Sequence, residues 1–294
     1  TTAETANFTV EATDSDAPPA TDQQALSVSV VEMGAVTYFS AASNTTDTTN
    51  LDTWQDKVVL NFSSGEADDW VILAFADNLG DYWGGKVNVQ LEVDGSTEGE
   101  LYRRQHYSNH WLPFTAMSVS NLAAGSHTVK LQYRQMNEPE LDVSIRNARV
   151  VAIKKDQLEI AFAAADTAQA LGTSSADIVT LNWTPSAAGD YLLMYNTEFL
   201  GGWTDTVNIE ARHNASLTDA GADETRGGDD FCTWNSVGVV SCDTSSQTAK
   251  IAAWSSVTGK QIRRARIMAL RLSGSPFASY ESATADSQST TTLT

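Results

Sequence analysis

The chain has 294 residues, of which 41% are hydrophobic and 9% aromatic, and its formal net charge is −19. This composition excludes wholesale disorder, because such a chain can bury enough surface to offset its ordering entropy. Binding of nucleic acid requires clustered cations, and the first cation along the chain is Lys57, so no nucleic-acid partner is expected. No apolar run approaches the roughly 20 residues that cross a bilayer, so membrane insertion is not expected either.

The two ends of the chain differ from its middle. Residues 1–24 and 273–294 are rich in Thr, Ser, Ala and Asp, and neither segment can form a core alone. They are either flexible tails or extended arms that add a strand to a neighbouring subunit. We adopt the arms as the working hypothesis, with Phe8, Val10, Phe277 and Tyr280 as the contact residues.

Between the ends, the local patterns predict β-strands. The segment Lys86–Val93 alternates strictly, with apolar residues at its odd-numbered positions, which predicts a half-buried strand followed by a turn at Asp94-Gly95. The runs Trp70–Ala76 and Tyr191–Tyr195 are continuously apolar, as in central strands that are covered on both faces. No stretch has a convincing helical period with a cap and a stop.

The middle of the chain contains the same pattern twice. Leu60-Asn61-Phe62 matches Leu181-Asn182-Trp183, Val87-Asn88-Val89 matches Val207-Asn208-Ile209, and the closing segment Ile145–Lys154 matches Ile262–Arg271. A period near 120 residues is typical of a duplicated domain. The sequence therefore predicts an all-β protein with two tandem jelly-roll-like β-sandwich domains, residues 25–156 and 157–272.

One part of this pattern resembles a known type of repeat. Gly125–Tyr133 followed by Ile145–Ile153 resembles a β-sandwich repeat of uncharacterised secreted and virion-associated structural proteins. The resemblance covers one sheet-forming half of the first domain, and the second copy departs from it with Gln247 in place of His127 and with Arg264 in place of Asn147. It implies a structural or surface role, and it offers no catalytic residue.

The chain has two cysteines, Cys232 and Cys242. Alternating residues on both sides of 235–238 predict a hairpin whose two arms are joined by a disulfide. The alternative is a pair of buried free thiols; a metal site is not expected, because no His or further Cys lies nearby in the sequence. A disulfide would indicate an oxidising compartment or a virion exterior.

Other chemistry is poorly supported. The sequence contains no nucleophile elbow, phosphate-binding glycine loop or zinc-protease motif, and His106 and His110 lie in a predicted loop. The acidic groups Asp68-Asp69, Asp229-Asp230 and Asp219–Glu224 lack the register of a calcium loop and are interpreted as solvated loops. We therefore expect no metal, no cofactor and no enzymatic activity, with a glycosidase-like carboxylate pair as a third-ranked alternative.

Three tryptophans give the better functional alternative. Trp83, Trp111 and Trp203 flank predicted turns, and they are either core anchors or platforms on which sugar rings stack. Among the N-glycosylation triplets, Asn44 and Asn214 are the preferred acceptors, because the others that recur in both copies lie inside predicted strands.

Arginines mark the closing strand of each copy: Arg146 and Arg149 in the first, Arg263 and Arg266 in the second. In an acidic chain they are expected to pair with carboxylates at a sheet edge or between subunits, the alternative being recognition of an anionic ligand. We conclude that the chain is a structural protein that assembles with copies of itself, on a virion surface as capsid, decoration or fibre, or in an extracellular filament. The alternative is a tandem carbohydrate-binding or adhesion module with glycans as partners.

Overall fold

The computed structural model describes residues 4–13, 21–30, 37–80, 86–104, 111–136, 141–200, 206–224 and 231–272. These residues contain no α-helix and one short 3-10 helix, η1 (Lys155–Gln157). The chain divides into two compact units, Thr1–Val36 and Thr37–Thr294. The first unit contains β1 (Glu4–Thr13) and β2 (Thr21–Val30), and the second contains all the other strands.

The first unit is a β-hairpin. β1 and β2 pair only with each other, as an antiparallel sheet of two strands. The register sets Phe8 opposite Leu26 and Ala6 opposite Val28, so these apolar positions share one face of the ladder, together with the polar positions Glu4, Asp22 and Gln24. The sequence predicted an extended arm that ends at residue 24, whereas strand pairing continues to Val30.

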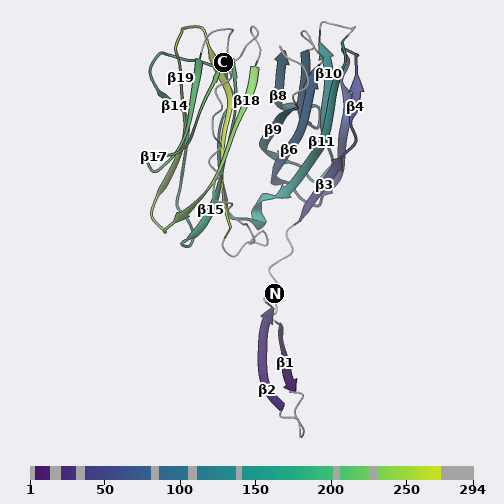
Figure 1. Cartoon of the computed structure of the whole chain (residues 1–294), viewed down its shortest axis with the longest axis vertical. Helices are drawn as coiled ribbons and strands as arrows, with labels where there is room; N and C mark the ends of the chain where they lie inside the picture. Colours follow the sequence, from purple (N-terminus) through teal and green to yellow (C-terminus); the bar gives the residue numbers. More distant parts are fainter. Residues whose placement is uncertain are drawn as a thin grey trace. The chain divides into compact units, whose positions relative to one another are not determined.

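The second unit consists of two sandwiches (Figure 1). The first sandwich contains β3 (Tyr38–Ser43), β4 (Asp47–Thr49), β5 (Gln55–Ser64), β6 (Asp68–Gly80), β7 (Lys86–Val93), β8 (Ser96–Arg104), β9 (Leu112–Leu122), β10 (Gly125–Met136) and β11 (Val143–Lys154). The second contains β12 (Ile160–Ala165), β13 (Gln169–Ala170), β14 (Ala176–Trp183), β15 (Gly189–Leu200), β16 (Thr206–His213), β17 (Ser216–Glu224), β18 (Phe231–Cys242), β19 (Gln247–Ser255) and β20 (Gln261–Arg271).

The two sandwiches have the same topology. The sheet orders are β3-β11-β6-β9 and β5-β10-β7-β8 in the first, and β12-β20-β15-β18 and β14-β19-β16-β17 in the second. Each strand of the first copy therefore has a counterpart in the second, and β4 and β13 pair with the closing strands β11 and β20 in the same way. The predicted fold class, an all-β protein with two tandem sandwiches from an internal duplication, is confirmed.

The duplication extends to individual side chains. Thr128 Oγ1 donates a hydrogen bond to Asn61 Oδ1 at 2.9 Å, and the equivalent Thr248 Oγ1 donates to Asn182 Oδ1 at the same distance. Both asparagines belong to glycosylation triplets that were expected to be less accessible because they lie inside predicted strands; the structure leaves both residues exposed. Each is nevertheless held in a strand by its threonine partner.

Each sandwich has a core of its own, and the continuous apolar runs form its central strands. β6 lies between β11 and β9, and β15 lies between β20 and β18. Trp70 of β6 and the equivalent Tyr191 of β15 are almost completely buried in their respective cores. Burying one such side chain stabilises the fold by about 2 to 3 kcal/mol.

One expectation about burial was wrong. β7 was predicted to be half-buried, yet Asn88 and Gln90, on its polar face, are buried as well. Hydrogen bonds across neighbouring strands compensate the burial of Gln90: Gln90 Nε2 donates to Gln132 Oε1 at 2.7 Å, and Gln132 Nε2 donates to Asp56 Oδ1 at 2.5 Å. Asn88 Nδ2 donates to Glu100 Oε1 at 2.9 Å. Side chains that satisfy one another across strands can be buried at low cost.

Candidate functional site

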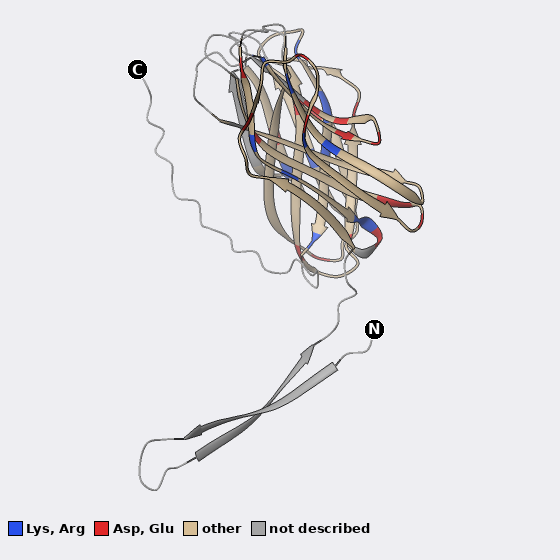
Figure 2. Cartoon of the chain, turned by 90° about the vertical axis from the view of Figure 1, so that its right-hand side faces the viewer, with Lys and Arg blue, Asp and Glu red and all other residues tan. Residues whose placement is uncertain are grey.

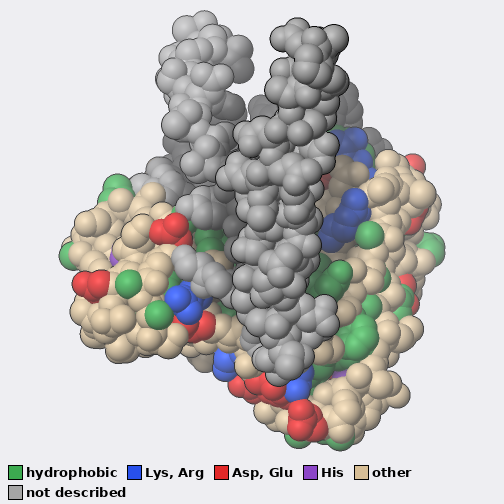
Figure 3. All heavy atoms as spheres, turned by 90° about the horizontal axis from the view of Figure 1, so that it is seen from below, with side chains coloured by type: hydrophobic (Ala, Val, Ile, Leu, Met, Phe, Trp, Pro, Cys, Tyr) green, Lys and Arg blue, Asp and Glu red, His purple; other side chains and the backbone are tan. Residues whose placement is uncertain are grey.

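The two sandwiches meet along a cleft of about 310 Å³. Its lining comes from equivalent strands of the two copies: Phe75, Thr115, Ala116 and Met117 from the first, and Met194, Tyr195, Asn196, Asn235, Ser236 and Val237 from the second. Asn196 Nδ2 donates hydrogen bonds to the Thr115 carbonyl at 3.1 Å and to Asn235 Oδ1 at 2.6 Å. Figure 3 shows hydrophobic side chains on the coloured surface of the sandwiches.

A buried carboxylate fixes this contact. Glu198 of β15 is 2% exposed, and its Oε1 accepts a hydrogen bond from the Glu100 backbone N–H of the first sandwich at 2.7 Å. Its Oε2 accepts from Arg263 Nε at 2.6 Å, and Arg264 Nη1 lies 3.1 Å from both carboxylate oxygens. Buried carboxylates are tolerated when cations and hydrogen-bond donors surround them.

The backbone at Arg264 is shaped by this network. Arg264 has a φ of 47°, in the left-handed region that favours Gly and Asn, and it lies at a register shift between β20 and β15. The first copy has the same bulge with Asn147, whose φ is 50°. Arginine is less favourable than asparagine in this backbone conformation. In the second copy this residue contributes its guanidinium to Glu198.

Arg266 ties the sandwiches together a second time. Its Nη1 donates to the carbonyl oxygens of Glu98, at 2.6 Å, and Met117, both in the first sandwich, and its Nε donates to Asp166 Oδ1 at 3.0 Å. The predicted pairing of the arginines with carboxylates is thus present within one chain. β20 lies inside its sheet, so these cations do not protect a sheet edge as the sequence suggested.

The equivalent arginines of the first sandwich make local contacts. Arg146 Nε lies 3.3 Å from Asp77 Oδ2, and its guanidinium stacks 4.0 Å from the centre of the Trp111 ring. Arg149 donates to the Ala148 carbonyl at 2.9 Å and also to Asn44 Oδ1. Trp111 is half-buried, and one face of its ring is already covered, which leaves at most the other face for a sugar.

The two proposed glycosylation acceptors are both exposed, and both are hydrogen-bonded. Asn44 lies between β3 and β4 and accepts from Arg149. Asn214 lies in a turn with a φ of 46°, and its Nδ2, the atom that a glycan would occupy, donates to Gln247 Oε1 at 2.6 Å. A glycan at Asn214 would leave a single N–H on Nδ2 for this contact of the turn.

The predicted disulfide is wrong. No disulfide joins Cys232 and Cys242, and they lie near opposite ends of one continuous strand, β18, which pairs with β15 along its whole length. Ten residues of extended strand span about 33 Å, whereas a disulfide needs Cα atoms within about 7 Å. Pairing with β15 overrides the turn preference at 235–238, so the expected hairpin does not form.

Cys242 has an unexpected neighbour. Its Sγ lies 3.9 Å from His213 Nε2, a juxtaposition that the sequence does not suggest because the residues lie on different strands. Burial raises the pKa of the Cys242 thiol and lowers the pKa of His213. Both shifts favour the neutral thiol and imidazole, whereas a nucleophilic cysteine requires the thiolate.

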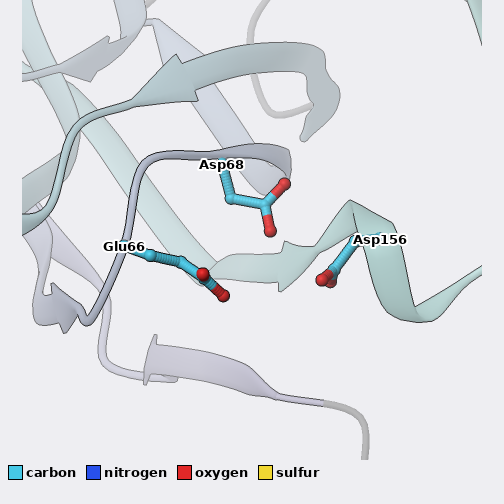
Figure 4. A group of neighbouring side chains, drawn as sticks. All are labelled: Glu66, Asp68 and Asp156. Atoms are coloured by element: carbon cyan, nitrogen blue, oxygen red, sulfur yellow. The ribbon is translucent and has the colours of Figure 1, made fainter.

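One group of acidic residues has the spacing of a metal site. The carboxylates of Glu66, Asp68 and Asp156 converge in Figure 4. Lys154 Nζ lies 2.7 Å, 3.1 Å and 3.1 Å from these three carboxylates. The hydrogen bonds that Lys154 donates to the three carboxylates raise its pKa. The Lys154 ammonium is therefore the cation that pairs with this cluster. Figure 2 shows Lys and Arg residues in blue and Asp and Glu residues in red on the described strands.

Some of the residues that the sequence analysis singled out lie outside the described part of the chain. They are Trp83, Trp203, His106, His110, Asp229-Asp230, Phe277 and Tyr280. The run Asp219–Glu224 belongs to strand β17 rather than to a loop. Phe8 and Val10 lie in β1, inside the hairpin. Among the described residues, no helix is long and apolar enough to cross a membrane.

No protein-family model matches this chain, and no curated protein matches it. Similar solved structures include a xanthan lyase from Paenibacillus (12% identity, TM-score 0.27, 81% of this chain and 25% of that chain). They also include tandem CBM51 modules of a family 98 glycoside hydrolase from Streptococcus pneumoniae (8%, TM-score 0.22, 80% and 99%). A third is an insecticidal delta-endotoxin from Bacillus thuringiensis (10%, TM-score 0.28, 80% and 52%). The chain spans about a quarter of the xanthan lyase, and likenesses this distant carry no argument about function.

The sheet edges differ in their protection against further pairing. Of the outermost strands in the four main sheets, β5, β8, β14 and β17 carry charged residues, β9 carries a proline, and β3 and β12 have six residues each. β18 has 12 residues with neither a charge nor a proline. Near its end, Val237 is 65% and Val239 is 37% exposed. Charges, prolines and short length are the usual protection of edge strands, and β18 lacks all three.

Proposed function

We propose that this chain is a non-enzymatic structural protein that assembles with copies of itself through its N-terminal hairpin. The observation that carries the proposal is the two-stranded sheet of β1 and β2, which forms a compact unit of its own. A sheet of only two strands is at best marginally stable in water and is stabilised by packing against a further layer. A neighbouring subunit would supply that layer and pair with the free strand edge.

The remaining features agree with a structural role. The two sandwiches are joined by hydrogen bonds that Glu198 accepts from the Glu100 backbone N–H and that Arg266 donates to the Glu98 carbonyl, which suits a rigid building block. Cys242 and His213 favour their neutral forms, and the Lys154 ammonium pairs with all three carboxylates of the acidic cluster. The proposed setting remains a virion surface or an extracellular filament, although the absent disulfide removes one reason for an oxidising compartment.

The test compares the full chain with a version that lacks residues 1–36, since residues 37–294 form a compact unit with cores of their own. Light scattering coupled to size exclusion and negative-stain microscopy should show oligomers or fibres for the full chain and monomers for the truncated chain. The melting temperature of the sandwiches should stay nearly unchanged.

A matched pair of variants tests whether assembly depends on the face of the hairpin that carries Phe8 and Leu26. Phe8→Ser combined with Leu26→Ser should abolish assembly, whereas Asn7→Ser combined with Ser27→Ala, at a cross-strand pair on the other face, should retain it. If the truncated chain assembles as well as the full chain, the hairpin has no role and the proposal is wrong.

A further inference from the structure

We infer that the cleft between the two sandwiches binds an uncharged small molecule with an apolar body and one carboxamide-like group, which both donates and accepts a hydrogen bond. The cleft has a volume of about 310 Å³. Small-molecule sites have volumes of about 300 to 1,000 Å³, so a ligand of this cleft is small. The inference concerns the sandwiches alone and is independent of the N-terminal hairpin.

The first sandwich contributes a mostly apolar wall. Thr115 of β9 lies directly opposite Phe75 of β6, and Met117 lies two residues further along β9. Residues that are two apart on a strand, or directly opposite on its neighbour, share one face of the sheet, and all three of these residues line the cleft. The Phe75 ring and the Met117 thioether are groups that pack well against an aromatic ring of a ligand.

The second sandwich contributes two amides beside further apolar side chains. Asn196 of β15 lies opposite Asn235 of β18, and Met194 lies opposite Val237, so these four side chains also share one face. Among the described residues, none that carries a charge lines the cleft. A charged ligand would therefore lose its hydration without gaining a counter-charge, and a sugar would find few partners for its hydroxyl groups.

Hydrogen bonds fix the orientation of both amides. The Thr115 carbonyl can only accept, so the Asn196 atom at 3.1 Å from it is Nδ2. The other N–H of this nitrogen is donated to Asn235 at 2.6 Å, so the Asn235 atom that accepts it is Oδ1. Asn196 Oδ1 and Asn235 Nδ2 then have no partner among the residues that the structure describes.

These two atoms are complementary to a carboxamide. Asn196 Oδ1 accepts a hydrogen bond, Asn235 Nδ2 donates one, and a carboxamide carries a donor and an acceptor side by side. Asn196 is 7% exposed, and an acceptor without a partner costs more at such a position than at an open surface. A ligand amide at this end of the cleft would satisfy both groups while its apolar body contacts the methionines.

The duplication shows that the fold itself does not require the two amides. Phe75 and Asn196 each lie five residues after the buried aromatic residue of their central strand, so they are equivalent. Their strand partners, Thr115 and Asn235, are therefore equivalent as well. The first copy folds with a phenyl ring and a hydroxyl at these positions. The second copy instead has a polar pair in a mostly apolar cleft, which is the usual composition of a small-molecule site.

Binding is tested with 2-naphthamide, an uncharged two-ring carboxamide, on the full chain with isotope-labelled methionine methyl groups. The probe should shift the NMR resonances of Met117 and Met194 and leave that of Met136, on β10, unchanged. Its charged counterpart 2-naphthoate should shift neither, and neither should glucose. The inference is wrong if 2-naphthamide leaves both methionines unchanged up to its solubility limit, or if naphthoate or glucose shifts them as strongly.

A matched pair of variants tests the amide. Asn235→Asp keeps the shape and the acceptor oxygen of the side chain but removes its donor, so it should weaken binding of 2-naphthamide about tenfold. Asn50→Asp makes the same change in the exposed loop between β4 and β5, and it should bind like the unchanged chain. Equal affinity of these two variants would overturn the assignment of a carboxamide.

A further variant tests the location and does not depend on the folding of Asn235→Asp. Val237 lines the cleft and is 65% exposed, so Val237→Trp should fill the cleft without changing the melting temperature. Binding of 2-naphthamide should be abolished in this variant. If Val237→Trp binds the probe like the unchanged chain, the probe binds outside the cleft and the inference fails.

Discussion

Glu198 and its counterpart Asp77 provide a controlled measurement of the contact between the sandwiches. The register places Glu198 opposite Arg263 on β20, as it places Asp77 opposite Arg146 on β11. Glu198 is buried between two guanidiniums and a backbone N–H of the other sandwich, whereas the side chains of Asp77 and Arg146 are about one-third exposed. The same chemical change can therefore be compared in two environments.

Glu198→Gln removes the buried charge, and its amide group can turn a donor towards the half-buried guanidiniums of Arg263 and Arg264. Breaking a buried ion pair in this way costs about 3 to 5 kcal/mol, whereas an exposed pair contributes about 0 to 1 kcal/mol. For a domain pair of this size, 1 kcal/mol corresponds to roughly 2 to 4 °C in melting temperature. Glu198→Gln should lower the melting temperature by roughly 6 to 20 °C, and Asp77→Asn by less than about 4 °C.

Calorimetry on residues 37–294 measures both variants without interference from assembly. Small-angle scattering should also show a loosened pair of sandwiches for Glu198→Gln and no change for Asp77→Asn. Equal melting shifts for the two variants, or a shift below about 3 °C for Glu198→Gln, would refute the idea that the buried network holds the sandwiches together.

Two further predictions concern the turns between paired strands. Ala215 has a φ of 66° where the first copy has Gly95, whose added Cβ would meet no atom within 4 Å. Ala215→Gly should therefore raise the free energy of unfolding by about 1 kcal/mol, and Gly95→Ala should lower it by a similar amount, because only backbone strain differs. Urea unfolding measures both changes, and a lower free energy of unfolding for Ala215→Gly would contradict the reasoning. Burial alone would lower the pKa of His127, but hydrogen bonds with Asp94 and with a backbone carbonyl, together with the Asp94 charge, raise it above 6.5. The stabilisation from protonated His127 should be complete below pH 6.5 and should be lost as the pH rises through the higher pKa of the folded state. Urea unfolding should therefore show a free energy of unfolding that declines across this pH range, and His127→Gln should abolish the decline.

The sequence by itself determined the fold class and the duplication. Strand alternation, as in Lys86–Val93, and the repeated closing segments are local patterns that survive in any packing, because side chains alternate between the faces of every strand. The apolar runs at Trp70–Ala76 and Tyr191–Tyr195 likewise predicted central strands, and the sheet orders confirm this. The expected link between arginines and carboxylates was also sound, although the partners were unknown.

Tertiary pairing decided the features that the sequence left open. The residues around Asn235 favour a turn, but they pair continuously with β15 instead. This pairing keeps the two cysteines far apart, so the expected disulfide does not form. Residues far apart in the chain, such as Glu100 and Glu198, came together only when two domains docked. The N-terminal arm became a hairpin because its two strands satisfy each other's backbone groups. A local pattern specifies which face a residue takes, but the partner on that face is set by strands that are distant in the sequence.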